Sequence, residues 1–268
     1  MSVLHSVTHH ENNAEAPELV LIHGWGAHSG VWGTVLAALE KHFRITCIDL
    51  PGHGHSPEFI DNSIDGWATA VLEVAPEKAI WLGWSLGGLV AQRATAMASE
   101  RVEKLILLAS TPKFVATAGW LNAVDERVFK AFHTEVICDP RASLKRFIAL
   151  QTRGSKTASE DSRTLRKTLL QSEPEAAALD AGMQLLLTSD LRKQAGEINC
   201  PVYVLGGEKD TLIPCAALPA MSELFLNAEF NLIKQAGHAP FLSHPDEFCQ
   251  LLHDYCFRNK LEEDKGEQ

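Results

Sequence analysis

The chain has 268 residues, 46% of them hydrophobic, and a formal net charge of −10. This length suits one large domain with an insertion. An apolar run of about 18 residues is absent, so we expect no membrane-spanning helix. The N-terminal segment lacks the apolar core of a secretory signal, so we expect a cytoplasmic protein. The negative charge argues against nucleic acid as a partner.

Cofactor-binding patterns are also missing. The six cysteines are scattered, without the C-x-x-C spacing of a zinc site, so we expect free thiols and no metal. The Gly52-His53-Gly54 turn lacks the further glycine of a dinucleotide-binding motif, and no P-loop lysine follows it. We therefore expect a reaction that needs no cofactor.

Short apolar runs alternate with helical patterns along the chain. The predicted strands are Leu19–Ile22, Arg44–Asp49, Ala79–Leu82, Lys104–Ala109, Val202–Leu205 and Phe230–Ile233. The predicted helices outside the central segment are Gly30–Lys41, Ile64–Val74, Leu86–Ala98 and Pro245–Phe257. This alternation predicts an α/β fold with a mainly parallel, doubly wound sheet.

Strand patterns are absent from about Lys113 to Gln194, where the sequence is helical in character. We predict that residues 113–194 form a helical cap inserted into a core made of residues 1–112 and 195–268. This segment is basic in an acidic chain, with 13 Lys/Arg against 10 Asp/Glu over residues 113–193. Within residues 141–167 the only acidic residues are Glu160 and Asp161, against eight cations: Arg141, Lys145, Arg146, Arg153, Lys156, Arg163, Arg166 and Lys167. The pattern suggests docking of an acidic partner, and an ordinary solvated helix face is the alternative.

A serine lies between two glycines in Gly83-Trp84-Ser85-Leu86-Gly87. A predicted strand precedes this motif and a predicted helix follows it. Strand, sharp turn and helix form the context of a nucleophile elbow, in which the serine hydroxyl is exposed at the end of the sheet. We predict that Ser85 is a nucleophile, and an idle serine in a glycine-rich turn is the alternative.

A serine nucleophile needs a base, and the base needs a carboxylate that orients it. Asp210 follows the predicted strand Val202–Leu205, and His238 follows the next strand along the chain. Ser, then Asp, then His is the order of an α/β-hydrolase. We predict the triad Ser85, Asp210 and His238, with Glu208 and Asp180 as alternative acids.

The first predicted parallel strand leads into His23-Gly24-Trp25-Gly26. The backbone N–H groups of Trp25 and Leu86 are candidates for the oxyanion hole, which stabilises the negative charge of the transition state. The Trp25 indole either forms a wall of the acyl pocket or packs in the core. His23 is interpreted as a residue that shapes the loop and not as a second base.

These motifs together resemble the pimeloyl-[acyl-carrier protein] methyl ester esterase family of biotin synthesis, within the α/β-hydrolase superfamily. The resemblance runs from about Leu19 to Phe257, and its most specific segments are Leu21–Gly26, Lys78–Val90, Arg146–Thr152 and His238–Phe248. It implies a carboxylesterase that removes the methyl ester from a pimeloyl chain carried by an acyl carrier protein. It also implies a substrate site made of Trp25, Ser85, Leu86, Phe147, Ile148, Ala149, Leu150, Gln151 and His238.

The family also docks its carrier through four arginines on the cap. Arg146 and Arg163 match two of them, whereas the other two positions are Ala142 and Ser159 in this chain. Neighbouring cations are candidates to replace the missing pair, namely Arg141, Arg153, Lys156 and Arg166.

Three other functions use the same fold. A broad-specificity carboxylesterase for short-chain esters has the same triad, and a C–C bond hydrolase is related to it. A non-catalytic binding module ranks last because all three triad residues are present. We expect a monomer.

Overall fold

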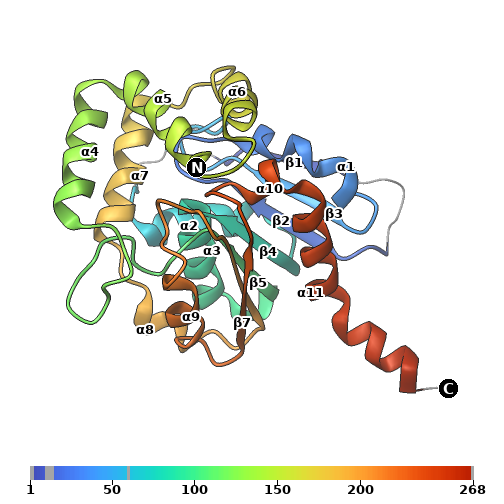
Figure 1. Cartoon of the computed structure of the whole chain (residues 1–268). Helices are drawn as coiled ribbons and strands as arrows, with labels where there is room; N and C mark the ends of the chain where they lie inside the picture. Colours follow the sequence, from blue (N-terminus) through green and yellow to red (C-terminus); the bar gives the residue numbers. More distant parts are fainter. Residues whose placement is uncertain (1–2, 10–14, 59–60, 267–268) are drawn as a thin grey trace.

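The computed structural model describes residues 3–9, 15–58 and 61–266, and these form a seven-stranded sheet with helices packed against it (Figure 1). The strand order is β1-β3-β2-β4-β5-β6-β7. All neighbouring strands are parallel except β1, which pairs antiparallel with β3. The strands are β1 Ser6–His9, β2 Glu18–Ile22, β3 Arg44–Ile48, β4 Ala79–Trp84, β5 Val102–Leu108, β6 Val202–Gly207 and β7 Ala228–Ile233.

The helices fall into two groups. Around the sheet lie η1 Ser29–Thr34, α1 Leu36–Leu39, α2 Ile64–Val74, α3 Leu86–Met97, η2 Ser99–Arg101, α8 Arg192–Ala195, α9 Ala217–Ser222, α10 Pro240–Ser243 and α11 Pro245–Gly266. Between β5 and β6 lie the four cap helices, α4 Glu126–Cys138, α5 Pro140–Gln151, α6 Ala158–Leu169 and α7 Ala176–Thr188. Figure 1 shows the cap helices together on one side of the molecule, beyond one end of the sheet.

The sheet follows from its apolar runs. Every residue of β4 is buried, because helices cover both faces of this central strand. The six predicted strands are all present, with ends that differ by at most two residues, and the predicted fold class is confirmed. The boundaries of the cap at residues 113 and 194 stay a prediction.

Two elements differ from the sequence prediction. The helix predicted over Gly30–Lys41 is wrong, because the segment forms the 3-10 helix η1 followed by the short helix α1. The His28 side chain accepts a hydrogen bond from Gly30 N and begins η1, and Val35 separates the two helices with φ −115° and ψ −13°. Strand β1 was not predicted, because a four-residue edge strand with polar residues gives little apolar signal.

Two smaller findings concern the chain as a whole. The six cysteines are free, as predicted. Among the helices of the described part, none is long and apolar enough to cross a membrane.

Candidate active site

Ser85 lies on the turn between β4 and α3, at the carboxyl end of the sheet. Its backbone has φ 54° and ψ −117°, a strained conformation for a residue with a side chain. The flanking glycines make the turn possible, because a Cβ at Gly83 would collide with the Gly87 backbone. Ser85 N donates to Leu108 O (2.9 Å), and Ser110 Oγ donates to Ser85 O (2.7 Å). Both bonds fix the turn that presents the hydroxyl.

His238 and Asp210 form a buried pair, and each side chain is only 1% exposed. His238 Nδ1 lies 2.8 Å from Asp210 Oδ2. The other carboxylate oxygen accepts from the N–H groups of Leu212 (2.8 Å) and Ile213 (3.0 Å), which fixes its direction. Since the carboxylate accepts the Nδ1 proton, His238 Nε2 is free to act as a base. That nitrogen is buried and has no hydrogen-bond partner among the described residues.

Two further contacts hold the His238 loop. The Trp84 indole Nε1, next to Ser85 in sequence, donates to His238 O (2.8 Å). His238 N donates to Gln151 O (3.1 Å) at the end of α5. The His238 loop is therefore tied both to the turn that carries Ser85 and to the cap.

The alternative acids lie elsewhere. Asp180 Oδ1 lies 2.6 Å from His133 Nε2, in a pair that joins α7 to α4. Glu208 Oε2 accepts from Gln235 N (3.1 Å). Asp210 is thus the one of the three carboxylates that contacts His238.

Ser85 and His238 line a cavity of about 310 Å³ whose walls are otherwise mostly apolar. The apolar lining consists of Phe114, Val124, Val128, Phe129, Ala131, Phe132, Phe147, Leu150, Met183, Leu186 and Leu212. Two charged residues also line it, Arg146 on α5 and Glu135 on α4, and the Arg146 guanidinium Nη1 donates to the Glu135 carboxylate. Both side chains are largely exposed, at 62% and 45%, so this ion pair lies at the rim. The cavity suits an apolar chain that enters beneath a charged rim.

Residues 147–151, which were predicted to line the site, lie on α5, and their side chains point to different faces of that helix. Phe147 and Leu150 line the cavity. Ile148 is fully buried in the core, Ala149 is exposed, and neither is among the cavity residues. Successive helical residues point about 100° apart, so a continuous run cannot share one face. Gln151 is buried, and it contacts the site through its carbonyl, which holds His238 N.

Trp25 and Leu86 are fully buried and are not among the residues that line the cavity. The Trp25 ring lies edge-on against Phe147, with centroids 4.9 Å apart, and its Nε1 donates to Leu179 O on α7 (2.8 Å). The indole thus supports the wall from behind. The backbone of the turn that carries Trp25 approaches Ser85 closely, since a Cβ built on Gly24 would lie 3.2 Å from Ser85 Cβ.

The predicted carrier-binding arginines differ in their contacts. Arg146 pairs with Glu135, and Arg141 pairs with Glu173 (3.0 Å). Arg153 and Arg163 are exposed, and the described residues offer them no ion pair. The sequence alone gave no sign of either pairing, since Arg141 and Glu173 are 32 residues apart.

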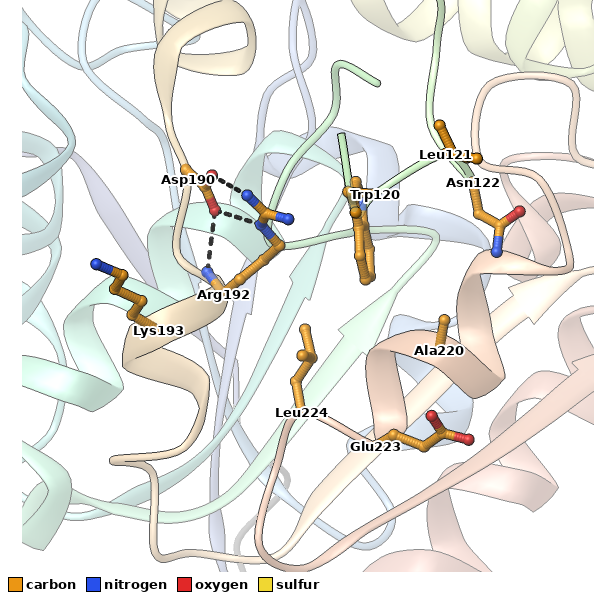
Figure 2. A pocket seen from close by; sticks show the side chains of 10 residues that line it. Trp120, Leu121, Asn122, Asp190, Arg192, Lys193, Ala220, Glu223 and Leu224 are labelled. Atoms are coloured by element: carbon orange, nitrogen blue, oxygen red, sulfur yellow. Dashed lines mark hydrogen bonds and ion pairs between the residues drawn. The ribbon is translucent and has the colours of Figure 1, made fainter. Parts of the chain in front are cut away.

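A larger hollow of about 740 Å³ lies away from these residues, between the 119–122 loop, α8 and α9 (Figure 2). In its wall, Arg192 donates to both Asp190 oxygens (2.8 and 2.6 Å) and lowers the pKa of that carboxyl to about 2. The Arg192 guanidinium also lies 6.0 Å from the centroid of the Trp120 ring. No triad residue lines this hollow.

Comparison with known proteins agrees with this geometry. Residues 17–245 match the family described as alpha/beta hydrolase fold. Two solved structures share the fold. One is the esterase EaEST from Exiguobacterium antarcticum, with a TM-score of 0.84, 19% identity, and coverage of 95% of this chain and 99% of that one. The other is an enol-lactonase from Burkholderia xenovorans LB400, with a TM-score of 0.81, 20% identity, and coverage of 94% and 96%.

The chain therefore belongs to the α/β-hydrolase fold family and is a carboxylic ester hydrolase. It is 42% identical over 236 residues to the pimeloyl-[acyl-carrier protein] methyl ester esterase of Pectobacterium carotovorum subsp. carotovorum (strain PC1). That match covers 88% of this chain and 92% of the relative. Within the fold family, the chain belongs to the pimeloyl-[acyl-carrier protein] methyl ester esterase family.

Proposed function

We propose that this enzyme hydrolyses the methyl ester of pimeloyl-[acyl-carrier protein] to pimeloyl-[acyl-carrier protein] and methanol, a step of biotin biosynthesis. The observation that carries the proposal is the apolar cavity, which has Ser85 and His238 in its wall and a charged rim. A seven-carbon chain with an uncharged methyl ester at its far end suits such a cavity. The name of the relative supports the same substrate.

The first half of the reaction is acyl transfer to the serine. His238 Nε2 takes the proton of Ser85 Oγ as this oxygen attacks the ester carbonyl. The N–H groups of Trp25 and Leu86 stabilise the oxyanion, and Asp210 orients the imidazole and stabilises its charged form. His238 then gives its proton to the leaving methoxy oxygen, so that methanol departs and an acyl-enzyme remains.

Water completes the reaction. His238 Nε2 takes a proton from a water molecule that attacks the acyl-enzyme, and it returns the proton to Ser85 Oγ as that bond breaks. The product has a free carboxylate at the end of the chain that lay in the cavity. Burying this charge in an apolar site is costly, so the product leaves and binds again only weakly.

The cap carries the carrier-binding part of the proposal. We assign residues 113–194 to this cap and Arg146, Arg163, Arg141 and Arg153 to the docking surface for the acidic carrier. Arg153 and Arg163 are exposed cations without an ion pair in the described part of the chain, which leaves them available to a partner. A cytoplasmic location and a monomeric state stay predictions from the sequence.

The test is to analyse the products by mass spectrometry after incubating the enzyme with methyl-pimeloyl carrier protein. We expect loss of the methyl group with the thioester intact, and no reaction with Ser85→Ala. Cleavage of the thioester would overturn the substrate orientation. Activity in Ser85→Ala, or no labelling of Ser85 by a fluorophosphonate probe, would overturn the serine mechanism.

A further inference from the structure

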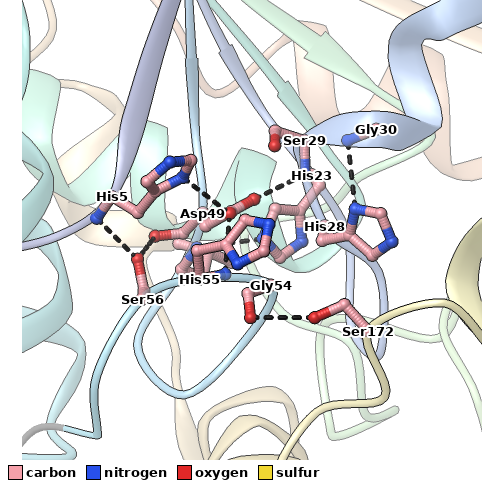
Figure 3. Close-up of polar contacts among 11 residues, drawn as sticks. His5, His23, His28, Ser29, Gly30, Asp49, Gly54, His55, Ser56 and Ser172 are labelled. Atoms are coloured by element: carbon pink, nitrogen blue, oxygen red, sulfur yellow. Dashed lines mark hydrogen bonds and ion pairs between the residues drawn. The ribbon is translucent and has the colours of Figure 1, made fainter.

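Two buried histidines flank the turn that carries the Trp25 N–H. His23 and His53 are both fully buried, and their ring centroids lie 5.4 Å apart. His23 begins the turn after β2, and His53 lies on the loop after β3. Figure 3 shows His23 among the polar residues that surround the Asp49 carboxylate.

Both ring nitrogens of His23 are engaged with backbone. Its Nε2 accepts from Leu50 N (2.9 Å), and an N–H group can only donate, so the ring proton is on Nδ1. His23 Nδ1 therefore donates to Gly24 O (2.8 Å). Gly24 O and Trp25 N–H belong to the same peptide unit, which is planar and trans. Fixing this carbonyl thus fixes the direction of the Trp25 N–H.

His53 holds the next peptide, but through its N–H group. Its Nδ1 lies 2.8 Å from Pro51 O, which can only accept, so this nitrogen carries the proton. Its Nε2 accepts from Gly26 N (3.3 Å). The turn is closed by Ala27 N donating to Gly24 O (3.2 Å), and Gly26 has φ +69°, as the third residue of a type II turn requires. The peptide held by His53 is the central one, whose orientation distinguishes type I from type II turns.

The His53 loop also contacts the cap. Ser172 Oγ donates to Gly54 O (3.0 Å), and Glu175 N donates to Gly52 O (3.2 Å). The turn itself reaches α7 through the Trp25 indole. The backbone around the proposed oxyanion donor is therefore fixed from the sheet side by the histidines and from the cap side by the indole.

We propose that His23 and His53 are positioning residues for catalysis, which aim the Trp25 N–H at the oxyanion by hydrogen bonding the two peptides on either side of Trp25. Neither acts as a base, because both nitrogens of each ring are engaged with backbone. The inference rests on the proposed oxyanion role of the Trp25 N–H. The two rings are required to do opposite things to the turn: Nδ1 of His23 must donate a hydrogen bond, and Nε2 of His53 must accept one.

Amide side chains separate these demands, because the Asn amide matches the Nδ1 position of histidine and the longer Gln amide matches Nε2. His23→Asn keeps the donor to Gly24 O, whereas His23→Gln keeps only the acceptor for Leu50 N. His53→Gln keeps the acceptor for Gly26 N, whereas His53→Asn keeps only the donor to Pro51 O. At each position the two variants carry polar amides that differ by one methylene group. Any effect of losing the buried imidazole ring is therefore common to both variants, and the difference between them reports the retained hydrogen bond.

The readouts are kcat and KM for a short p-nitrophenyl ester and the affinity for a boronic acid that adds to Ser85 as a tetrahedral anion. We expect His23→Gln and His53→Asn to lose about 10- to 100-fold in kcat, less than the ~10²- to 10³-fold cost of removing a donor. KM should change less than about 3-fold, and boronate affinity should fall with kcat, as for an interaction made only in the transition state. His23→Asn and His53→Gln should stay within about 5-fold of the parent.

Ser222→Ala, on α9, is the control outside this network. Its hydroxyl donates to Pro219 O (2.8 Å) and bonds neither histidine nor any peptide that they contact, so kcat should not change. The positioning role is overturned if both amides at a position give the same kcat, or if the order of the pair is reversed. A parent enzyme that forms no boronate adduct at Ser85 would overturn the serine mechanism as well.

Discussion

Acid should destabilise this protein through His53, because burial lowers the pKa of its imidazole from 6.5 to about 4. The ring is fully buried, and its Nε2 must stay unprotonated to accept from Gly26 N. Between pH 6.5 and pH 4 the unfolded chain binds a proton at this residue and the folded chain does not. The free energy of unfolding therefore falls as the pH falls through this window, and the loss is complete below about pH 4.

The size of the effect follows from the shift in pKa. One pKa unit corresponds to about 1.4 kcal/mol. At pH 5 the solution is about 1.5 pH units below the pKa of the histidine in the unfolded chain. Lowering the pH from 7 to 5 should therefore reduce the free energy of unfolding by about 2 kcal/mol through His53 alone. Burial also lowers the pKa of His23, to about 3, and that change has the same sign.

Urea unfolding at pH 7 and pH 5 measures this contribution when the parent is compared with His53→Gln. The variant keeps an acceptor for Gly26 N and has no group that titrates at this position. We expect the parent to lose about 2 kcal/mol more than the variant between the two pH values. Equal losses would refute the reasoning, because the buried neutral imidazole would then not account for the acid sensitivity.

Three further predictions concern other parts of the chain. Arg101 donates to four backbone carbonyls between residues 72 and 77, so Arg101→Ala should lower the urea-unfolding free energy by about 2 kcal/mol; a change under about 0.5 kcal/mol would contradict this. Glu135→Gln removes the carboxylate that pairs with Arg146 at the cavity rim, which leaves this cation available to the acidic carrier. We expect kcat/KM to rise about 2- to 5-fold for the carrier substrate and to stay unchanged for a short ester. Equal changes for both substrates would refute the docking role. Gly87→Ala should prevent folding, as measured by circular dichroism, because the new Cβ would collide with the backbone oxygens of both Ile22, the last residue of β2, and His23. A folded, active variant would be contrary evidence.

The sheet could be predicted, and Ser85, Asp210 and His238 could be placed at one edge of it, because their signals are local. Parallel strands read as continuous apolar runs, and Ser85 is marked by its glycines and by the strand and helix around it. Asp210 and His238 each follow a strand that ends at the same edge of the sheet as Ser85. Parallel topology therefore brings together residues that are far apart in the chain.

The cavity walls and the charge pairing could not be predicted in this way. Phe129 and Phe132 line the site because α4 packs beside α5. The sequence pattern of a helix does not indicate which other helix will pack against it. Glu135 was missed for the same reason, although it pairs with Arg146. The roles of the His23 and His53 nitrogens depend on backbone groups of two loops that meet only in the folded protein.

The central claim is that the enzyme recognises its ester on an acyl carrier protein. The most direct measurement compares kcat/KM for methyl-pimeloyl carrier protein with that for the same methyl-pimeloyl thioester on free pantetheine, at low and high salt. The scissile bond is identical in the two substrates, so any difference reports the carrier. We predict a much higher value for the carrier substrate, and we expect salt or the double variant Arg146→Glu, Arg163→Glu to reduce this preference. Equal values at every salt concentration would contradict the account and leave an esterase that ignores the carrier.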